Sequence, residues 1–167
     1  MVTRAKWDSK TGLAEAEIPA DAISVDLKTR GNTLSFRKCG DAEADAVELA
    51  TLALAARRDK VEKVELVWVP DDVLSSRGVH LDETPGDTPV SAMVDEHVDA
   101  VRLDYSRLGL VADRINEALA ADSYKRWTRS QVRTVLVRGI ELGRLQLEDL
   151  ADEVREEVQK AMNKRKV

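Results

Sequence analysis

The chain has little of the material from which redox, metal and membrane proteins are built. Its 167 residues include a single cysteine, Cys39, which excludes a disulfide within the chain and a site of paired cysteine thiolates. No apolar run approaches the roughly 20 residues that cross a bilayer, and the first residues lack the apolar stretch of a secretion signal. We therefore expect a cytoplasmic protein that does not enter a membrane.

Aromatic residues, histidines and clustered glycines are also scarce. With 4% aromatic and 43% hydrophobic residues, a core must consist mainly of Val, Leu, Ile and Ala. His80 and His97 stand near acidic residues, but the spacing marks no third ligand, so both are interpreted as loop residues. The eight glycines are scattered singly, so there is no phosphate-cradling loop and no nucleophile elbow. The sequence predicts no metal, no cofactor and no enzymatic activity.

The first seventy residues have the pattern of a small α+β domain. Apolar and polar residues alternate on both sides of Gly31 and Asn32, which suit a tight hairpin turn. An apolar segment with acidic residues at its start and arginines at its end indicates a helix, and a Val-rich segment ending at Pro70 indicates a strand. The expected elements are strands at residues 23–29 and 32–38, a helix at 41–59 and a strand at 61–70, with a further strand allowed at 13–18.

These patterns divide the chain into three parts. A small strand-strand-helix-strand domain is expected at residues 1–74, an acidic linker at 75–98 and a mainly helical region at 99–167. Glycines and prolines interrupt any periodicity in the middle part, and residues 78–99 contain no Lys or Arg. The alternative to a linker is an acidic strap that folds over a basic surface of the same molecule.

The last part predicts helices with one apolar face each. A helix is expected after Asp104 or Ser106, either of which can cap it, and Thr128 with Gln131 has the spacing of a capping box at the next helix. Gly139 lies in the apolar stripe of that second helix and indicates a closely packed partner helix. Gly143 has the same interpretation. A third amphipathic helix is expected from about residue 145 to the end of the chain.

Positive charge is concentrated in residues 123–144, which we call the basic segment. It contains six Lys or Arg residues and one acidic residue, in a chain whose formal net charge is −5. At 100° per residue, Arg129, Arg133 and Arg144 fall on one flank of the apolar stripe, and two more cations precede the helix. Trp127 is interpreted as a hydrophobic staple, and the alternative is stacking on a base.

The order of elements resembles the ribbon-helix-helix family of DNA-binding proteins over residues 98–145. The resemblance rests on a short alternating strand, "DAVRLDYS", followed by a helix, a turn and "TRSQVRTVLVRGIELG". It implies that two chains pair these strands into a ribbon that enters the major groove. Val101 and Leu103 would then face the dimer core, while Ala100, Arg102 and Asp104 would face outward. Arg102 would read base edges, and residues 128–130 would contact phosphates.

Two hypotheses of different classes follow. The first is a dimeric, antitoxin-like regulatory protein that binds double-stranded DNA, with a protein partner on its N-terminal domain. The second is an adaptor or structural subunit that uses the basic segment and the acidic linker for protein contacts. A plain helix bundle without a nucleic-acid role is a further alternative. The candidate nucleic-acid-binding residues are Arg102, Lys125, Arg126, Thr128, Arg129, Ser130, Arg133 and Arg144.

Overall fold

The structure, a computed structural model, describes residues 4–8, 12–14, 17–40 and 43–165. The chain forms two compact units, and each unit combines three separate segments. Unit 1 comprises Met1–Phe36, Glu65–Glu83 and Val98–Lys125, and unit 2 comprises Arg37–Val64, Thr84–His97 and Arg126–Val167. The division predicted at residues 74 and 98 does not coincide with these units, because each unit brings together segments that are distant in sequence.

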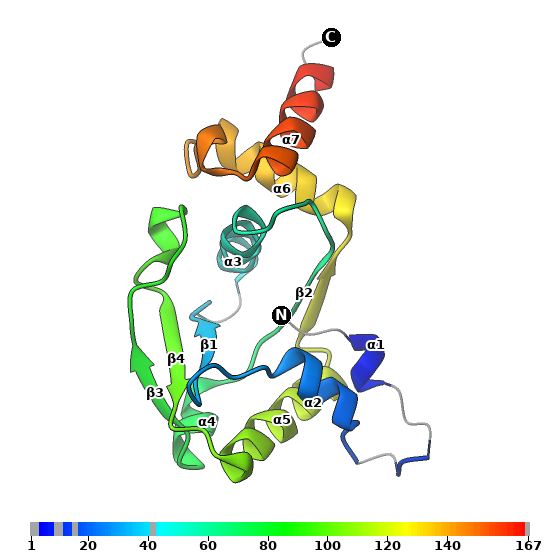
Figure 1. Cartoon of the computed structure of the whole chain (residues 1–167), viewed down its shortest axis with the longest axis vertical. Coiled ribbons are helices and arrows are strands. Elements are labelled where there is room, and N and C mark those ends of the chain that lie inside the picture. Colours follow the sequence, from blue (N-terminus) through cyan, green and yellow to red (C-terminus); the bar gives the residue numbers. More distant parts are fainter. Residues whose placement is uncertain (1–3, 9–11, 15–16, 41–42, 166–167) are drawn as a thin grey trace. The chain divides into compact units, whose positions relative to one another are not determined.

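Short strands form two small sheets, and together with the helices they give the α+β fold that the sequence predicted (Figure 1). One sheet has three strands in the order β1-β4-β3, and the other pairs β2 with β5. In the first sheet β3 runs antiparallel to β4, with Leu81 opposite Ala100. The strands are β1 (Leu34–Arg37), β2 (Val64–Val67), β3 (His80–Glu83), β4 (His97–Val101) and β5 (Tyr124–Trp127).

Unit 1 is built around the long helix α5. As predicted, its apolar face is buried, including Val111, Ile115 and Leu119, and it packs in one core with Trp7. The indole of Trp7 is 1% exposed, and its Nε1 donates to Asp26 Oδ2 at 2.9 Å, so its polar atom is satisfied inside the core. The helices of this unit are α1 (Arg4–Trp7), α2 (Ala20–Asp26), α4 (Asp71–Ser76) and α5 (Tyr105–Ala120).

The prediction of a strand at residues 23–29 is wrong, because residues 23–26 belong to the helix α2, which begins at Ala20. The chain turns into the helix after Pro19, whose carbonyl accepts from the backbone N–H of Ala22. Ala22 and Leu27 are buried, whereas Val25 is exposed, which is a helical rather than an alternating pattern. Tertiary burial therefore overrides the local strand preference. Of the strand allowed at 13–18, residues 13–14 and 17–18 are not in a strand, and 15–16 lie outside the described residues.

The tight turn predicted at Gly31 and Asn32 is confirmed. Both residues have positive φ angles, 62° and 61°, as a two-residue hairpin turn requires. Arg30 and Thr33 exchange two backbone hydrogen bonds across it, at 3.1 and 3.2 Å. The turn closes a single bridge rather than two full strands, since only its second arm continues into β1.

Unit 2 is a set of packed helices in which α6 contacts both α3 and α7 (Figure 1). The helix predicted at residues 41–59 is confirmed as α3, although residues 41–42 lie outside the described residues. The third predicted helix begins later than expected, at Asp152. The guanidinium of Arg155 donates to backbone carbonyls of the preceding short turn and holds it in place. The elements are α3 (Ala44–Ala56), η1 (Ser91–Met93), α6 (Arg129–Glu141), η2 (Leu147–Asp149) and α7 (Asp152–Arg165).

The two glycines predicted to sit in a helix contact have different roles. Gly139 is at the contact of α6 with α3, because a Cβ there would lie 2.7 Å from both Cδ atoms of Leu52. The predicted close partner is therefore α3. The prediction for Gly143 is wrong: it has a φ of 69°, and a Cβ there would meet no other side chain or distant backbone atom within 4 Å. It ends the helix instead, with its N–H donating to the carbonyl of Ile140 at 3.0 Å.

Residues 75–98 are not a solvated linker. The segment contains β3 and η1, and its Val79, Val90 and Met93 are buried. In unit 2, Asp87 pairs with Arg57, as the alternative of an acidic strap anticipates. The segment is packed rather than solvated because its apolar residues are buried, which its low Lys and Arg content does not reveal.

Candidate nucleic-acid interface

The basic segment forms β5, the N-cap residue Thr128 and α6. Thr128 and Gln131 make the predicted capping box: Thr128 Oγ1 accepts from the Gln131 N–H at 3.3 Å, and Gln131 Oε1 accepts from the Thr128 N–H at 2.8 Å. Thr128 and Ser130 are exposed. The start of α6 is therefore where the sequence placed it, and it is open to solvent.

Two of the predicted phosphate-binding arginines share one carboxylate. Arg129 Nη2 lies 2.6 Å from Glu157 Oε2, and Arg133 Nη1 lies 3.0 Å from Glu157 Oε1. Glu157 comes from α7, and its side chain is 19% exposed, whereas that of Arg129 is 62% exposed. The two guanidinium groups thus bind the two oxygens of a carboxylate that the fold partly encloses.

The pKa directions follow from this geometry. Partial burial acts to raise the pKa of Glu157, but the hydrogen bonds and charges of Arg129 and Arg133 outweigh it, so the pKa of Glu157 is lowered. The hydrogen bond to Glu157, followed by the charge of that group, raises the pKa of Arg129. Glu157 and Arg129 are therefore both ionised at neutral pH.

Two further arginines of the segment pair with α3. Arg138 Nη1 lies 3.1 Å from Glu48 Oε2, and Arg144 Nη1 lies 3.3 Å from Asp45 Oδ1. The expectation that Arg129, Arg133 and Arg144 form an open cationic surface is therefore contradicted. After folding, Asp45 and Glu48 from α3 and Glu157 from α7 thus pair with four of the six cations of the segment.

The two cations before the helix lie on a strand instead of a turn. Lys125 and Arg126 belong to β5 and are exposed, and both have interaction partners. Trp127 is half-buried, and its Nε1 is enclosed by protein. An enclosed indole edge does not suit stacking on a base, which leaves packing at the start of α6 as the better interpretation of Trp127.

Arg102 is positioned differently from the expectation. It follows the end of β4 with a φ of 56°, a left-handed conformation that is uncommon for residues other than glycine. Ala100, predicted to face outward, is completely buried, while Val101 is half-buried. Because the positive φ breaks the alternation after Val101, Leu103 returns to the core. Arg102 itself is exposed, as predicted.

The strand of the expected intermolecular ribbon already has two neighbours. β4 is the central strand of its sheet and lies between β1 and β3 of the same chain. The expectation that it pairs with its copy in a second chain is therefore corrected, because both of its edges are occupied. β5 also takes the place of the turn between the two helices of the ribbon-helix-helix pattern.

Three loops meet at one end of unit 1, where β4 ends and α5 begins (Figure 1). They comprise residues 28–33, 77–80 and 102–107, and we call them the loop cluster. The Leu103 N–H donates to the carbonyl of Asn32 at 2.9 Å, and Arg107 Nε donates to the carbonyl of Gly78 at 3.1 Å. Sheet pairing adds a third link, which places His80 opposite Val101.

The loop cluster carries exposed cations that have no carboxylate partner. Four of its cations are exposed, and within the part of the chain that the structure describes none of these four makes an ion pair. Asp104 is the one acidic residue of these loops, and Arg107 Nη1 already binds it at 2.8 Å. Asp104 also caps α5, as predicted, by accepting from the Arg107 N–H at 2.8 Å. The four cations are Lys28, Arg30, Arg77 and Arg102.

A fully exposed aromatic ring accompanies these cations. Tyr105, the first residue of α5, is 95% exposed. Sequence reasoning singled out Arg102 but missed the other cations and Tyr105. Their short motifs, "LKTRGN", "RGVH" and "RLDYSR", are far apart in the chain, so no local signal reveals that they meet.

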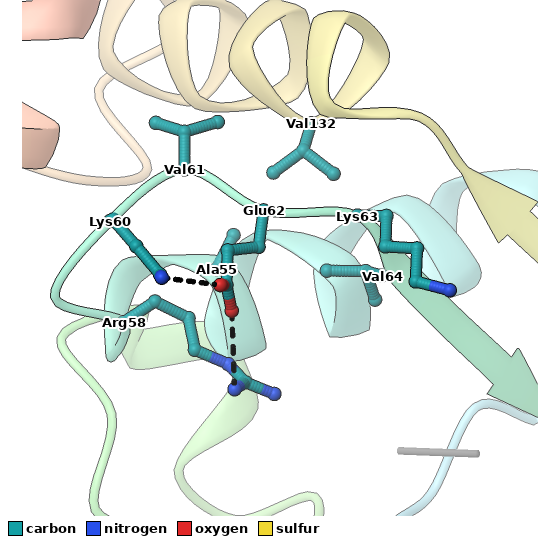
Figure 2. Close-up of a pocket in the computed structure, with 8 residues that line it drawn as sticks. All are labelled: Ala55, Arg58, Lys60, Val61, Glu62, Lys63, Val64 and Val132. Carbon is teal, nitrogen blue, oxygen red and sulfur yellow. Dashed lines mark ion pairs between the residues drawn. The ribbon is translucent and has the colours of Figure 1, made fainter. Parts of the chain in front are cut away.

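Two hollows in unit 2 differ greatly in size. A groove of about 430 Å³ runs between α6 and α7, lined by Arg133, Thr134, Val137, Glu157, Lys160, Ala161 and Lys164. The other hollow, near the end of α3, leaves no room for a water molecule. In Figure 2, which draws the residues that line this hollow, the carboxylate of Glu62 lies between two cations, 3.1 Å from Lys60 Nζ and 3.9 Å from Arg58 Nη1.

Further searches add no assignment to these surfaces. Among the described residues, no group of three or more His, Cys, Asp or Glu side chains is arranged to hold a metal ion. The helices in the described ranges are each too short or too polar to cross a membrane. Comparison with protein-family models, with curated proteins and with solved structures gave no match.

Proposed function

We propose that this chain is a non-enzymatic DNA-binding protein that contacts DNA through the loop cluster of unit 1. The observation that carries the proposal is the group of four exposed cations without carboxylate partners in the described structure. Lys and Arg side chains that release counterions from phosphates supply most of the affinity of a protein for DNA. The exposed guanidinium of Arg102, a residue already singled out by the sequence, lies among them.

The basic segment is a poorer candidate for the same role. A phosphate near Arg129 or Arg133 must compete with Glu157, which holds both guanidinium groups at short distance. Displacing this carboxylate would leave a partly buried charge without a partner, which is costly. The loop cluster has no such competitor, because its one carboxylate already binds Arg107.

The test compares two pairs of arginines. One variant carries Arg30→Gln and Arg102→Gln, and the matched control carries Arg129→Gln and Arg133→Gln, so both lose two positive charges. Binding to fluorescein-labelled DNA is followed by anisotropy from about 50 to 200 mM salt. We expect the loop-cluster variant to bind at least about tenfold more weakly at low salt and to show a shallower salt dependence, since each lost phosphate contact removes about 0.7 to 0.9 from the slope.

The control variant is expected to retain most of the wild-type affinity. Circular dichroism of both variants checks that the fold is intact. Equal losses in the two variants, or a wild-type protein that does not bind DNA at low salt, would overturn the proposal.

The groove between α6 and α7 favours a second candidate function, that of an adaptor. Its lining includes Arg133, Lys160 and Lys164, while its carboxylate, Glu157, is engaged by arginines. Val137 and Ala161 give it an apolar part. Cations beside an apolar surface match an amphipathic helix with acidic flanks from a partner protein. A second copy of α7 fits less well, because its face along this groove offers Ala161 but no large apolar side chain to fill it.

A designed probe tests the adaptor function. The probe is a labelled helical peptide with leucines along one face and glutamates on its flanks, and the control peptide carries lysines in place of the glutamates. We expect the acidic peptide to bind, and the double variant Lys160→Glu and Lys164→Glu to lose that binding at least about tenfold. Equal binding of both peptides would contradict the charge complementarity that this function requires.

A further inference from the structure

We infer that the loop cluster selects single-stranded over duplex DNA, with the ring of Tyr105 as a platform for an unpaired base. The inference rests on the proposed function, because it concerns the same surface. It adds the class of DNA that is bound and the residue that distinguishes it.

The first support is the exposure of the ring. Tyr105 is 95% exposed, whereas the described residue Tyr124 of the same unit packs against the core. A single exposed apolar residue is common on protein surfaces and needs no explanation by itself. What sets Tyr105 apart is its place in the loop cluster, three residues after Arg102.

The second support is the rigidity of the backbone that presents the ring. Asp104 caps the helix through the Arg107 N–H, and the same carboxylate binds the Arg107 side chain. On its other side, Leu103 is buried, and its N–H donates to the carbonyl of Asn32. Tyr105 is thus attached to a fixed helix start, and little backbone entropy is lost when a base stacks on it.

The third support is the combination of an aromatic ring with phosphate-binding cations. Proteins that bind single strands without sequence preference combine a cationic surface that follows the backbone with aromatic side chains on which bases stack. In duplex DNA the faces of the bases are covered by their neighbours, so an exposed ring gains nothing unless the duplex opens. The cations alone would bind both forms, and Tyr105 would add affinity for one.

The experiment measures binding of the full chain to three labelled oligonucleotides of about 20 nucleotides: a single strand, the same sequence as a duplex, and a single strand of abasic sites. Wild type is compared with Tyr105→Phe and Tyr105→Ala. We expect the wild type to prefer the single strand, and Tyr105→Ala to weaken that binding by about five- to a hundredfold, the range for loss of one base-stacking contact.

The other arms separate stacking from a structural effect. Tyr105→Phe keeps the ring and is expected to bind the single strand as the wild type does. Tyr105→Ala is expected to leave the affinities for duplex and abasic DNA unchanged, because neither offers an accessible base. Equal weakening on all three probes, or a duplex that binds as tightly as the single strand, overturns this inference and leaves the proposed function intact. Absence of binding to every probe overturns both.

Discussion

The basic segment and the loop cluster carry similar amounts of positive charge, yet after folding most cations of the first pair with carboxylates and four cations of the second do not. In the basic segment, Arg129, Arg133, Arg138 and Arg144 all contact carboxylates of the same chain. In the loop cluster, four cations contact none in the described structure. The segment that dominates the charge pattern of the sequence is therefore the more neutral surface.

The difference shows how charge density along a sequence diverges from charge density on a surface. A helix packed between two others receives side chains from both neighbours, and here α3 and α7 supply Asp45, Glu48 and Glu157. In the loop cluster of unit 1, no described carboxylate pairs with the four exposed cations.

The largest effect is expected from the packing that brings α3 to α6. Leu52 is 2% exposed and fills the space over Gly139. Replacing Leu52 with Ala removes buried apolar surface and leaves a cavity, so we expect the free energy of unfolding to fall by about 2–5 kcal/mol. Urea denaturation followed by circular dichroism measures it. A loss below about 0.5 kcal/mol, the usual size for surface substitutions, would mean that α3 does not hold α6 in this way.

The second prediction concerns Glu157, whose removal is expected to make the basic segment more like the loop cluster. Glu157→Gln removes the carboxylate that Arg129 and Arg133 share, so the basic segment gains two unpaired cations. We expect DNA affinity at low salt to rise roughly tenfold and the salt dependence to steepen. The matched control is Glu156→Gln, which removes the same charge from an exposed pair with Lys160. If both variants gain affinity equally, net charge rather than the freed arginines explains the gain.

The third prediction compares two glycines, one just after α6 of the basic segment and one inside α5, which begins in the loop cluster. Gly143 has a φ of 69° at the end of α6, so Gly143→Ala is expected to destabilise the protein by about 1 kcal/mol. Gly109 lies inside α5 with open space around it, so Gly109→Ala is expected to stabilise by about 0.5–1 kcal/mol. Thermal unfolding of the two variants gives the sign of each change. Effects of the same sign would contradict the positive φ as the cause.

The smallest effect concerns pH. The pKa of Glu157 is lowered in the folded state, so the unfolded chain binds more protons between the folded and unfolded pKa values of this group. Its stabilising contribution is complete above the ordinary glutamate pKa of about 4.3 and is lost as the pH falls through the lowered folded pKa. We therefore expect the difference in unfolding free energy between wild type and Glu157→Gln to shrink below about pH 4. A difference that is constant with pH would contradict the ion pairs as its source.

Local signals predicted a large part of the fold. The apolar face of α5, the Asp104 cap, the Thr128 capping box and the turn at Gly31 and Asn32 each depend on a few neighbouring residues, and the structure confirms all of them. The α+β class follows from the same signals. Such features are predictable because the groups that satisfy each other lie within one or two turns of chain.

Predictions that depended on distant contacts failed. Residues 23–29 alternate as a strand would, but burial of Ala22 and Leu27 in the core of unit 1 makes the start of this segment a helix. The acidic stretch after residue 75 has the composition of a linker, yet four of its apolar residues are buried. Of the candidate site, Arg102 was found with its exposure, but the cations and the ring beside it were not.

The caps and the apolar periodicity of the sequence determined where α5 and α6 begin, because these signals act over short range. Tertiary contacts decided which cations stay available, because the ion pairs of Arg129, Arg133, Arg138 and Arg144 join residues at least 24 positions apart in the chain. The same long-range packing brought three unremarkable loops together around Arg102 and Tyr105. A cluster of cations can be recognised in the sequence, but whether it is neutralised depends on which side chains meet in the folded chain.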